Sequence, residues 1–524
     1  MNLNRKQEIP LNPFSPVVAL FLTPVDSDLF DFLKECHELI LSAPRLLVAV
    51  DEDLDKHGLR KKAVRVADAE WVANRTRALP CMPEPKQEPA KPLVLKQGRP
   101  RTLAYVVIIA LLLRGFWGAG FKSSDVTSNM QESMTLSVFF TNLGMKMPGR
   151  STLTELVNAV TNDTRLLMLD AQVARALQLN LDDFKTFLQD STHVDGNTTW
   201  PTDSRLMVDI VARLIRVGEK LGRVHLTPLD CEGLRKRLKK MTRLDLEIAF
   251  SQGKKGSKRS RRRRYEKLLR MSEGIQSGLT PKVDKLADDA KALDMRPSRK
   301  AFAERAVERL RSDLEALNKV CAACEARVIY EKKVPISDKI LSLSDPDAGF
   351  ISKGQRVPVI GYKPQLARSA NGFLTGIHLP QGNAPDSKNL LPMVDEVSGR
   401  TKVIPAVASV DDGYASKENW NELKARGIEV VSISGAKGRA LTPVEDWESD
   451  VYGEARNKRS AVESLMYTLK QGFDFGEVAR RGLEAVYGEL IEKGLAYNTC
   501  VTVRLRRKAT ERAMTESTPT KATG

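Results

Sequence analysis

Cysteine is scarce in this sequence, with 6 cysteines among 524 residues. Small secreted domains that depend on disulfides use cysteine far more densely, so the composition excludes a disulfide scaffold and suits a reducing compartment. The longest apolar run, residues 103–113, has 11 residues, well short of the roughly 20 that span a bilayer. The short apolar segment 17–22 lies between prolines and lacks a small-residue cleavage site, so no signal peptide is expected. We therefore expect a soluble intracellular protein with no membrane partner.

Several motifs of cofactor chemistry are also missing. There is no Gly-x4-Gly-Lys-Ser/Thr loop, so a nucleotide cofactor is not expected. The 5 histidines are scattered and form no metal or nucleophile motif. Cys321 and Cys324 have no second Cys or His pair at zinc spacing, so we interpret them as structural.

Positive charge is what the sequence has in excess. With 83 Lys+Arg against 66 Asp+Glu, the formal net charge is +17, which makes nucleic acid the first partner to consider. The charge is uneven, because residues 253–270 hold ten Lys/Arg, Arg261, Arg262, Arg263 and Arg264 among them, and one acid. Such a block is either a solvated flexible loop or an arm that contacts phosphates.

The length suggests three or four domains at about 150 residues each, and composition changes along the chain place their boundaries. We expect an N-terminal region of unknown role, a Pro-rich linker, a helical domain, a core in two pieces around a helical basic insertion, a C-terminal helix or strand, and a disordered tail. The corresponding residues are 1–80, 81–100, 101–175, 183–204 with 334–475, 205–333, 476–504 and 505–524.

Within the helical domain, residues 103–113 are apolar enough to form a buried helix. A second helix is expected around 126–143, and a third from a Ser151 or Thr152 cap towards Ala171.

The core pieces alternate strand and helix patterns. Strands are expected around Asp190, at 356–367, 372–380, 403–410 and 428–433, with helices at 387–397, 416–426 and 457–472. Strands that alternate with helices predict an α/β layer with parallel pairings.

Carboxylates occur at three places in this core. Asp190 lies within the first strand, Asp411 and Asp412 follow the strand 403–410, and Glu463 lies on the helix 457–472. Arg459 and Lys470 lie 4 residues before and 7 after Glu463, so the three form one helix stripe. Carboxylate oxygens are the ligands that Mg²⁺ prefers, and two such ions can assist displacement at phosphorus. Each acid also has a plainer interpretation, as a turn former or a surface ion-pair partner.

The three acidic blocks resemble those of DDE-type transposases from bacterial insertion sequences. The blocks are Asp190-Ser-Thr, Asp411-Asp412-Gly413-Tyr414 and Arg459-x3-Glu463-x6-Lys470. The last is similar to that family's Tyr-x2-Arg-x3-Glu-x6-Lys signature, with Arg456 at the Tyr position. Further similarity lies in residues 190–207 and 344–367, and in the helical block that ends at Val157. The resemblance covers roughly residues 100–475.

The resemblance implies an RNase H-like mixed sheet, interrupted by a mainly helical insertion and preceded by a helical domain that binds DNA. Asp190, Asp411 and Glu463 would hold two Mg²⁺ ions, with Mn²⁺ as a substitute. Arg459, Lys470 and Arg456 would contact the DNA, as would the arm with Arg261–Arg264. The family pattern favours Asp411 over Asp412, because it places the acid two residues before Gly-Tyr. Asp195 would point to the opposite face if the strand continued, and Asp203 lies beyond Pro201.

The implied function is a DNA transposase. It would act as a homodimer on double-stranded DNA in the bacterial cytoplasm, at the nucleoid. The enzyme would bind inverted-repeat element ends, cleave a phosphodiester at each and transfer the 3′-hydroxyls to target DNA. Two alternatives remain at this point: a metal-dependent DNA nuclease without strand transfer, and a catalytically inactive DNA-binding derivative.

Overall fold

The structure is a computed structural model that describes residues 27–77, 102–117, 129–145 (without 131), 149–198, 202–251 (without 223, 225, 227 and 228), 257–352 (without 293) and 358–516. These residues fall into two units. The first takes the described parts of 1–57, 99–197 and 347–524, and the second those of 58–98 and 198–346. The expected linker 81–100 lies outside the described residues, as do the last eight residues of the expected tail.

A five-stranded mixed sheet forms the centre of the first unit, in the order β6-β5-β1-β7-β8. β1, β7 and β8 are parallel, while β5 runs antiparallel to both β1 and β6. The strands are β1 (Thr186–Ser191), β5 (Gln365–Arg368), β6 (Leu374–His378), β7 (Val407–Val410) and β8 (Val430–Ile433). A mainly helical chain around a mixed parallel and antiparallel sheet agrees with the predicted α/β class.

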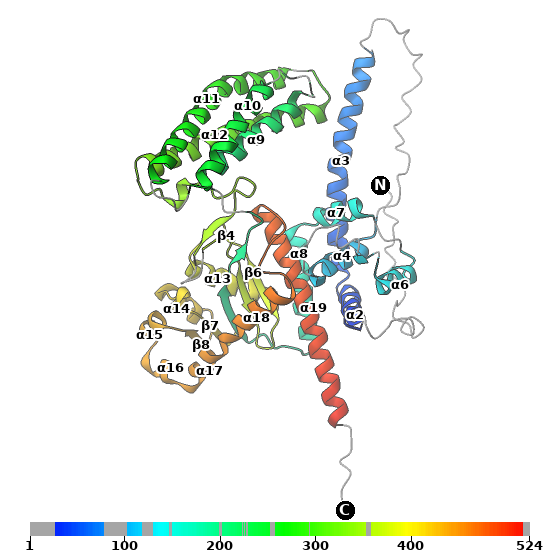
Figure 1. Ribbon diagram of the computed structural model, residues 1–524. Coiled ribbons are helices and arrows are strands. Elements are labelled where there is room, and N and C mark those ends of the chain that lie inside the picture. Colours follow the sequence, from blue (N-terminus) through cyan, green and yellow to red (C-terminus); the bar gives the residue numbers. More distant parts are fainter. Residues whose placement is uncertain are drawn as a thin grey trace, which may run out of the picture. The chain divides into compact units, whose positions relative to one another are not determined.

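Helices cover both faces of this sheet (Figure 1). Apolar side chains alternate along the strands, so Phe187, Ala408 and Val431 share one core cluster with α13 (Leu390–Thr401) and α14 (Lys417–Ala425). On the other face α18 (Ser460–Gly472) packs against β1 and β5. α17 (Asp450–Lys458) lies against β7 and β8. The carboxyl ends of β1 and β7 are therefore bounded by helices on each side.

Short elements complete this part of the chain. They are η4 (Asp386–Asn389) before α13, η5 (Asp412–Tyr414) after β7, and α15 (Ala436–Leu441) with α16 (Val444–Glu448) between β8 and α17.

A second, three-stranded sheet has the order β2-β4-β3. Its strands are β2 (Val194–Asp195), β3 (Gly349–Ile351) and β4 (Val359–Tyr362). The single strand expected at 356–367 is wrong, because β4 and β5 are separate strands in different sheets. Pro364 between them has no N–H for a ladder, and its carbonyl instead accepts a hydrogen bond from the Thr192 N–H at 3.1 Å.

Several helices of the first unit pack against the long helix α19 (Leu483–Glu516). α4 (Ala104–Trp117) and α8 (Asn162–Gln178) pack on it, and α4 is buried along most of its length, as its apolar sequence predicts. α6 (Met134–Asn142) and α7 (Arg150–Ala159) complete this group.

The single helix expected from Ser151 to Ala171 is wrong, because α7 and α8 are separate. The Thr161 hydroxyl caps α8, and both its N–H and its hydroxyl donate to Asp53, at 2.8 and 2.9 Å. The break therefore depends on a contact with a residue far away in the sequence.

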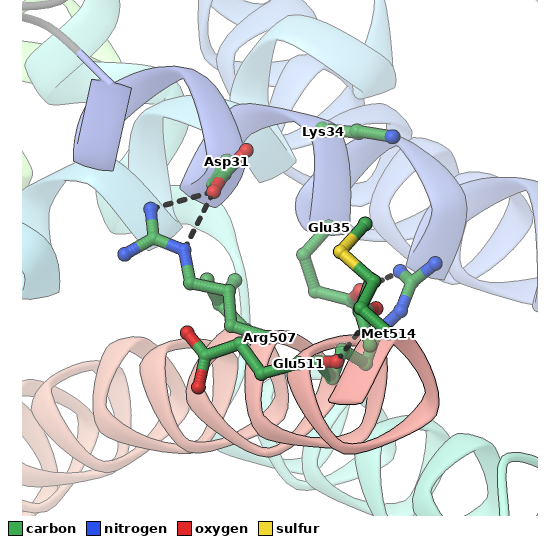
Figure 2. A pocket seen from close by; sticks show the side chains of 9 residues that line it. Asp31, Lys34, Glu35, Arg507, Glu511 and Met514 are labelled. Atoms are coloured by element: carbon green, nitrogen blue, oxygen red, sulfur yellow. Dashed lines mark hydrogen bonds and ion pairs between the residues drawn. The ribbon is translucent and has the colours of Figure 1, made fainter. Parts of the chain in front are cut away.

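The expected disordered tail is wrong for residues 505–516, which continue α19. Arg506 pairs with Glu35 and Glu38, and Arg507 with Asp28 and Asp31, all on α2 (Ser27–Ser42). These ion pairs fix the end of α19 against α2. A cavity of about 360 Å³ lies between the two helices. Figure 2 shows its charged lining, in which Arg507 turns towards Asp31 and no predicted site residue takes part.

Four helices form the second unit together with the later part of α3 (Arg45–Arg77). They are α9 (Asp203–Gly222), α10 (Cys231–Ala249), α11 (Ser257–Ala292) and α12 (Pro297–Cys324), with the short η2 (Glu325–Ile329) after them. The insertion between β2 and β3 is thus helical. η3 (Ile336–Asp338) precedes β3. The α3 residues Asp68 and Trp71 hydrogen-bond to Ser298 and Asp294.

The flexible-loop interpretation of residues 253–270 is wrong from Ser257 onward, because these residues are the first turns of α11. Tyr265, Leu268 and Leu269 are buried at helical spacing, which fixes this segment on the bundle core. Cys321 and Cys324 lie in the same core, and burial raises the pKa of the Cys321 thiol to about 11. No described helix is long and apolar enough to cross a membrane.

Candidate active site

Asp190 and Asp411 lie at the carboxyl ends of two neighbouring parallel strands. Leu188 of β1 is paired with Ser409 of β7, the last pair between these strands, and the same register extended by two residues would set Asp190 opposite Asp411. Neighbouring strands are about 4.8 Å apart. Asp411 keeps an extended backbone, with φ −86° and ψ 176°. The strand pairing thus brings together two acids that are 221 positions apart in the sequence.

The structure separates the roles of Asp411 and Asp412. The Asp412 Oδ1 atom accepts hydrogen bonds from the N–H groups of Lys437 and Gly438, at 2.8 and 3.0 Å, and so caps α15. Gly435, at φ 103°, makes room for this cap, because a Cβ there would come within 2.7 Å of Asp412. The Asp411 carboxylate instead accepts the Gly413 N–H at 2.9 Å, within its own turn.

Glu463 reaches the same place from α18 through Arg459. The Arg459 guanidinium lies 2.9 Å from a Glu463 carboxylate oxygen and 4.0 Å from one of Asp190. Asp190 is 6% exposed, whereas the Glu463 side chain is 59% exposed. The cation therefore stands between a buried and an exposed carboxylate.

The helix expected at 457–472 is confirmed from Ser460 to Gly472 as α18, but its first residues belong to α17, which ends at Lys458. Arg459 is the junction residue. No glycine or proline marks this break in the sequence. The predicted alignment of Arg459, Glu463 and Lys470 is kept, because Arg459 directly precedes α18 and the other two residues lie on that helix.

The other predicted DNA-binding residues lie in varied surroundings. Lys470 is half-buried on α18. The Arg456 guanidinium stands over the Trp447 ring, 5.1 Å from its centroid. Arg262 and Arg264 pair with Glu266 and Glu247, at 3.4 and 3.0 Å. Arg261 and Arg263 make no ion pair with the described residues.

A buried polar network under the two aspartates was missed by the sequence analysis. Tyr414, at the end of η5, is fully buried and donates a hydrogen bond to Gln365 Oε1. Gln365 in turn donates to Asp386 Oδ1 at 2.7 Å, and the Lys363 ammonium lies 2.8 Å from the same oxygen. Burial, followed by the charges of Asp386, Asp190 and Asp411, raises the pKa of Tyr414 well above its ordinary value. Tyr414 is part of the second acidic block, and Lys363 and Gln365 lie in the similar segment 344–367, but Asp386 carried no sequence signal.

A second missed side chain lies on the exposed face of α18. Tyr467 is one turn beyond Glu463 and 69% exposed. It gives this face an aromatic surface between Glu463 and Lys470.

The carboxylates of this site have the right chemistry for a hard divalent cation, but they are not gathered into a complete metal site. Asp190 and Asp411 supply carboxylate oxygens from a fixed pair of strands, the chemistry that Mg²⁺ and Mn²⁺ prefer. In the described part of the chain, no three His, Cys, Asp or Glu side chains are close enough together to hold a metal ion. Arg459 lies between two of the acids, with its guanidinium 2.9 Å from a Glu463 oxygen and 4.0 Å from an Asp190 oxygen.

Residues 346–499 match the family model described as the transposase DDE domain. That segment is similar to the transposase DDE domain family. The resemblance carried by the three acidic blocks, to a DDE-type transposase of an insertion sequence, is thereby confirmed. The transposase domain match includes Asp411 and Glu463, while Asp190 on β1 lies before it, beyond the helical insertion.

A known transposase is similar to part of this chain. Over 164 residues the sequence is 26% identical to the transposase for insertion sequence element IS1106 of Neisseria meningitidis serogroup B. The alignment covers 31% of this chain and 54% of that protein, so the chain spans about half the length of this relative. No solved structure matches the chain significantly.

Proposed function

We propose that this protein is a DNA transposase that uses Asp190, Asp411 and Glu463 to cleave the ends of an insertion sequence and join them to target DNA. One observation carries the proposal. Asp190 and Asp411 are at the carboxyl ends of the paired parallel strands β1 and β7, and Arg459 links Asp190 to Glu463 of α18, which supports their assignment to one site. Two of these three acids lie in a segment that matches the transposase DDE domain.

The strand arrangement supports an RNase H-like core. The order β6-β5-β1-β7-β8 has the antiparallel neighbours on one side of β1 and the parallel ones on the other. In such a sheet the carboxyl ends of the parallel strands β1 and β7 open at the same edge. That edge is where ligands bind in open α/β sheets.

The residues of the site would hold divalent metal ions between the strand ends and α18. When bound, two such ions would activate the attacking oxygen and stabilise the leaving one at the phosphodiester. Asp190 and Asp411 would be the fixed ligands, because their strands are part of the sheet core. Glu463 is exposed and would join them when Arg459 turns to a phosphate oxygen, a geometry that a guanidinium fork suits.

DNA contacts would come from two places. Arg459 lies at the junction before α18, and Tyr467 and Lys470 follow along the α18 face that carries Glu463. In the second unit, the first turns of α11 carry Arg261–Arg264, four adjacent cations that repel one another. A DNA phosphate bound there would offset that repulsion. Two ends must be processed together, so we propose a homodimer on DNA.

The test is a cleavage and joining assay with the full chain. The substrate is a duplex that carries the inverted repeats flanking the gene, incubated with MgCl₂ or MnCl₂ and a target plasmid. The proposal predicts metal-dependent cleavage at the element ends and joined products. It also predicts that Asp190→Asn and Glu463→Gln abolish both steps and change end binding in EDTA by less than about threefold.

Two results would overturn the proposal, and each would favour another function. Cleavage without joining of a pre-cut end would indicate a nuclease. Specific binding to the ends without cleavage in either metal would indicate a DNA-binding derivative.

A further inference from the structure

The turn that carries Asp411 is held by one buried side chain. After Asp411 the chain makes the short helix η5, which ends at Tyr414, and the Tyr414 ring lies in the core between the sheet, α13 and α14. Its hydroxyl donates to Gln365 Oε1 on β5, the strand on the far side of β1 from β7. Because burial and three nearby carboxylates raise the pKa of Tyr414, the phenol stays protonated and remains a donor.

The partner of Tyr414 is itself fixed from several directions. The Gln189 Nε2 atom donates to Gln365 Oε1 at 3.1 Å, and Gln365 Nε2 donates to Asp386 Oδ1 at 2.7 Å. Lys363 neutralises Asp386 at 2.8 Å. Gln365 is fully buried, and the Lys363 and Asp386 side chains are 10% and 15% exposed. Such a connected network in a low dielectric has little freedom to adjust.

The network also reaches Asp411 from the side. A Cβ on Gly413 would meet Asp411 Oδ1 at 3.0 Å and Asp386 Oδ2 at 3.4 Å, so Gly413 lies tightly between these two carboxylates. The Tyr414 carbonyl accepts a hydrogen bond from Asn419 of α14 at 2.9 Å. Asp386, Gly413 and Tyr414 thus confine the Asp411 turn.

We infer that Tyr414, Gln365 and Asp386 are positioning residues for the Asp411 carboxylate. They anchor the turn after β7 to β5, and so set the direction in which Asp411 faces Asp190. The inference rests on the proposed function, because it assigns these residues to the same metal-binding acids. It also gives Asp386 a definite role: this fourth carboxylate is committed to Lys363 and Gln365 and is not a metal ligand.

The central variant is Tyr414→Phe, which removes only the hydroxyl, and its matched control is Tyr497→Phe. Tyr497 is a buried tyrosine of α19 whose hydroxyl donates a single hydrogen bond to the Gly372 carbonyl at 2.7 Å. Each change removes one buried hydrogen bond, worth about 1 kcal/mol of stability, so a stability effect alone would affect both variants alike.

Two readouts are measured on the full chain. The first is the Mn²⁺ concentration that gives half-maximal end cleavage, and the second is Mn²⁺ binding by electron paramagnetic resonance without DNA. Partners that orient metal ligands contribute about 10–100-fold to metal affinity or activity. We expect Tyr414→Phe to raise both Mn²⁺ values about tenfold or more, with end binding in EDTA unchanged. Tyr497→Phe should match the wild type in both.

Asp386→Asn separates positioning from direct ligation. The asparagine keeps the shape but no longer neutralises Lys363, so a positioning role predicts a rise in the Mn²⁺ values of about 10–100-fold, as for other partners that orient metal ligands. A loss as deep as that of Asp411→Asn would make Asp386 a ligand and overturn this part of the inference.

The outcomes distinguish the two hypotheses. If the wild type cleaves but Tyr414→Phe has the metal dependence of Tyr497→Phe, the positioning role is wrong while the proposed function stands. If the wild type does not cleave, the proposed function fails, and the Mn²⁺ binding of the two variants still decides the role of Tyr414. Equal binding by both would overturn it.

Discussion

Replacing Glu492 with glutamine is expected to destabilise the first unit severely. Glu492 lies on α19 with a side chain that is 1% exposed. It pairs with Arg114 of α4, with Arg165 of α8 at 2.8 Å and with Arg480 at 3.4 Å. The first two arginine side chains are 4% exposed. One carboxylate thus compensates two buried guanidinium groups that join both helices to α19.

The magnitude follows from the charges that Glu492→Gln would leave behind. Glutamine keeps one acceptor for Arg165 but turns its NH₂ group, a donor, towards another guanidinium. Removing one partner of a buried ion pair costs about 3–5 kcal/mol. The matched control is Glu422→Gln, because Glu422 pairs with Arg426 at 2.8 Å but its side chain is 51% exposed. Exposed pairs contribute about 0–1 kcal/mol.

The assay is hydrogen exchange by mass spectrometry over a urea series, which reports each helix separately. We expect α4, α8 and α19 to lose protection at clearly lower urea in Glu492→Gln, while the bundle α9–α12 keeps its wild-type profile. A change in these three helices no larger than that of Glu422→Gln would refute the reasoning. An equal loss of protection in the bundle α9–α12 would show that the Glu492 ion pairs do not stabilise the first unit specifically.

Two further predictions concern DNA binding and pH. Arg261 and Arg263 make no ion pair with the described residues, whereas Arg262 and Arg264 each pair with a glutamate. The double change Arg261→Gln/Arg263→Gln should therefore lower the salt slope of DNA binding by up to about two. The double change Arg262→Gln/Arg264→Gln should lower it less, and equal slopes in a fluorescence-anisotropy salt titration would contradict this. Burial lowers the pKa of His37, against the opposing charge of Glu38, below the ordinary value of 6.5, and its Nδ1 lies 2.8 Å from the Tyr105 hydroxyl. The unfolded chain then binds a proton more readily than the folded one, so stability is lost as the pH falls below about 6.5. Urea midpoints across this pH range should decline in the wild type, and a similar decline in His37→Gln would refute the assignment.

The sequence predicted those elements whose pattern is local. The apolar run 103–113 forms α4, and Asp190 lies in β1 as expected. Ser416 caps α14, and the 428–433 segment contains β8. In each case, apolar spacing or a capping residue next to the element decides the conformation.

The remaining features depend on contacts between distant parts of the chain. Residues 505–516 have a polar composition typical of a tail, yet they are helical because Arg506 and Arg507 meet acids of α2. The composition of the basic block before Tyr265 is typical of a solvated loop or of an arm that contacts phosphates. The structure shows a helix there, because the apolar residues that follow are buried in the bundle core. Asp386 belonged to no motif, and nothing in the segment 344–367 linked Gln365 to Tyr414, because a polar network depends on which strands and turns come together in the fold.

The choice between neighbouring acids combined both kinds of information. The family pattern favoured Asp411 over Asp412, and the structure gives a physical reason for the same preference, because Asp412 caps α15. The roles of the three acids stay predictions that an experiment on these residues must test.

The most direct test compares Asp411→Asn with Asp412→Asn. Each replaces one carboxylate with an amide of the same shape at adjacent positions. In Asp412→Asn the amide oxygen can still accept the two N–H groups of α15, so Mg²⁺-dependent cleavage of element ends should stay within a few-fold of the wild type. Asp411→Asn should lose more than the roughly 100-fold that an indirect partner can cost, with end binding in EDTA retained. Wild-type cleavage by Asp411→Asn, or an equal loss in both variants, would contradict the account.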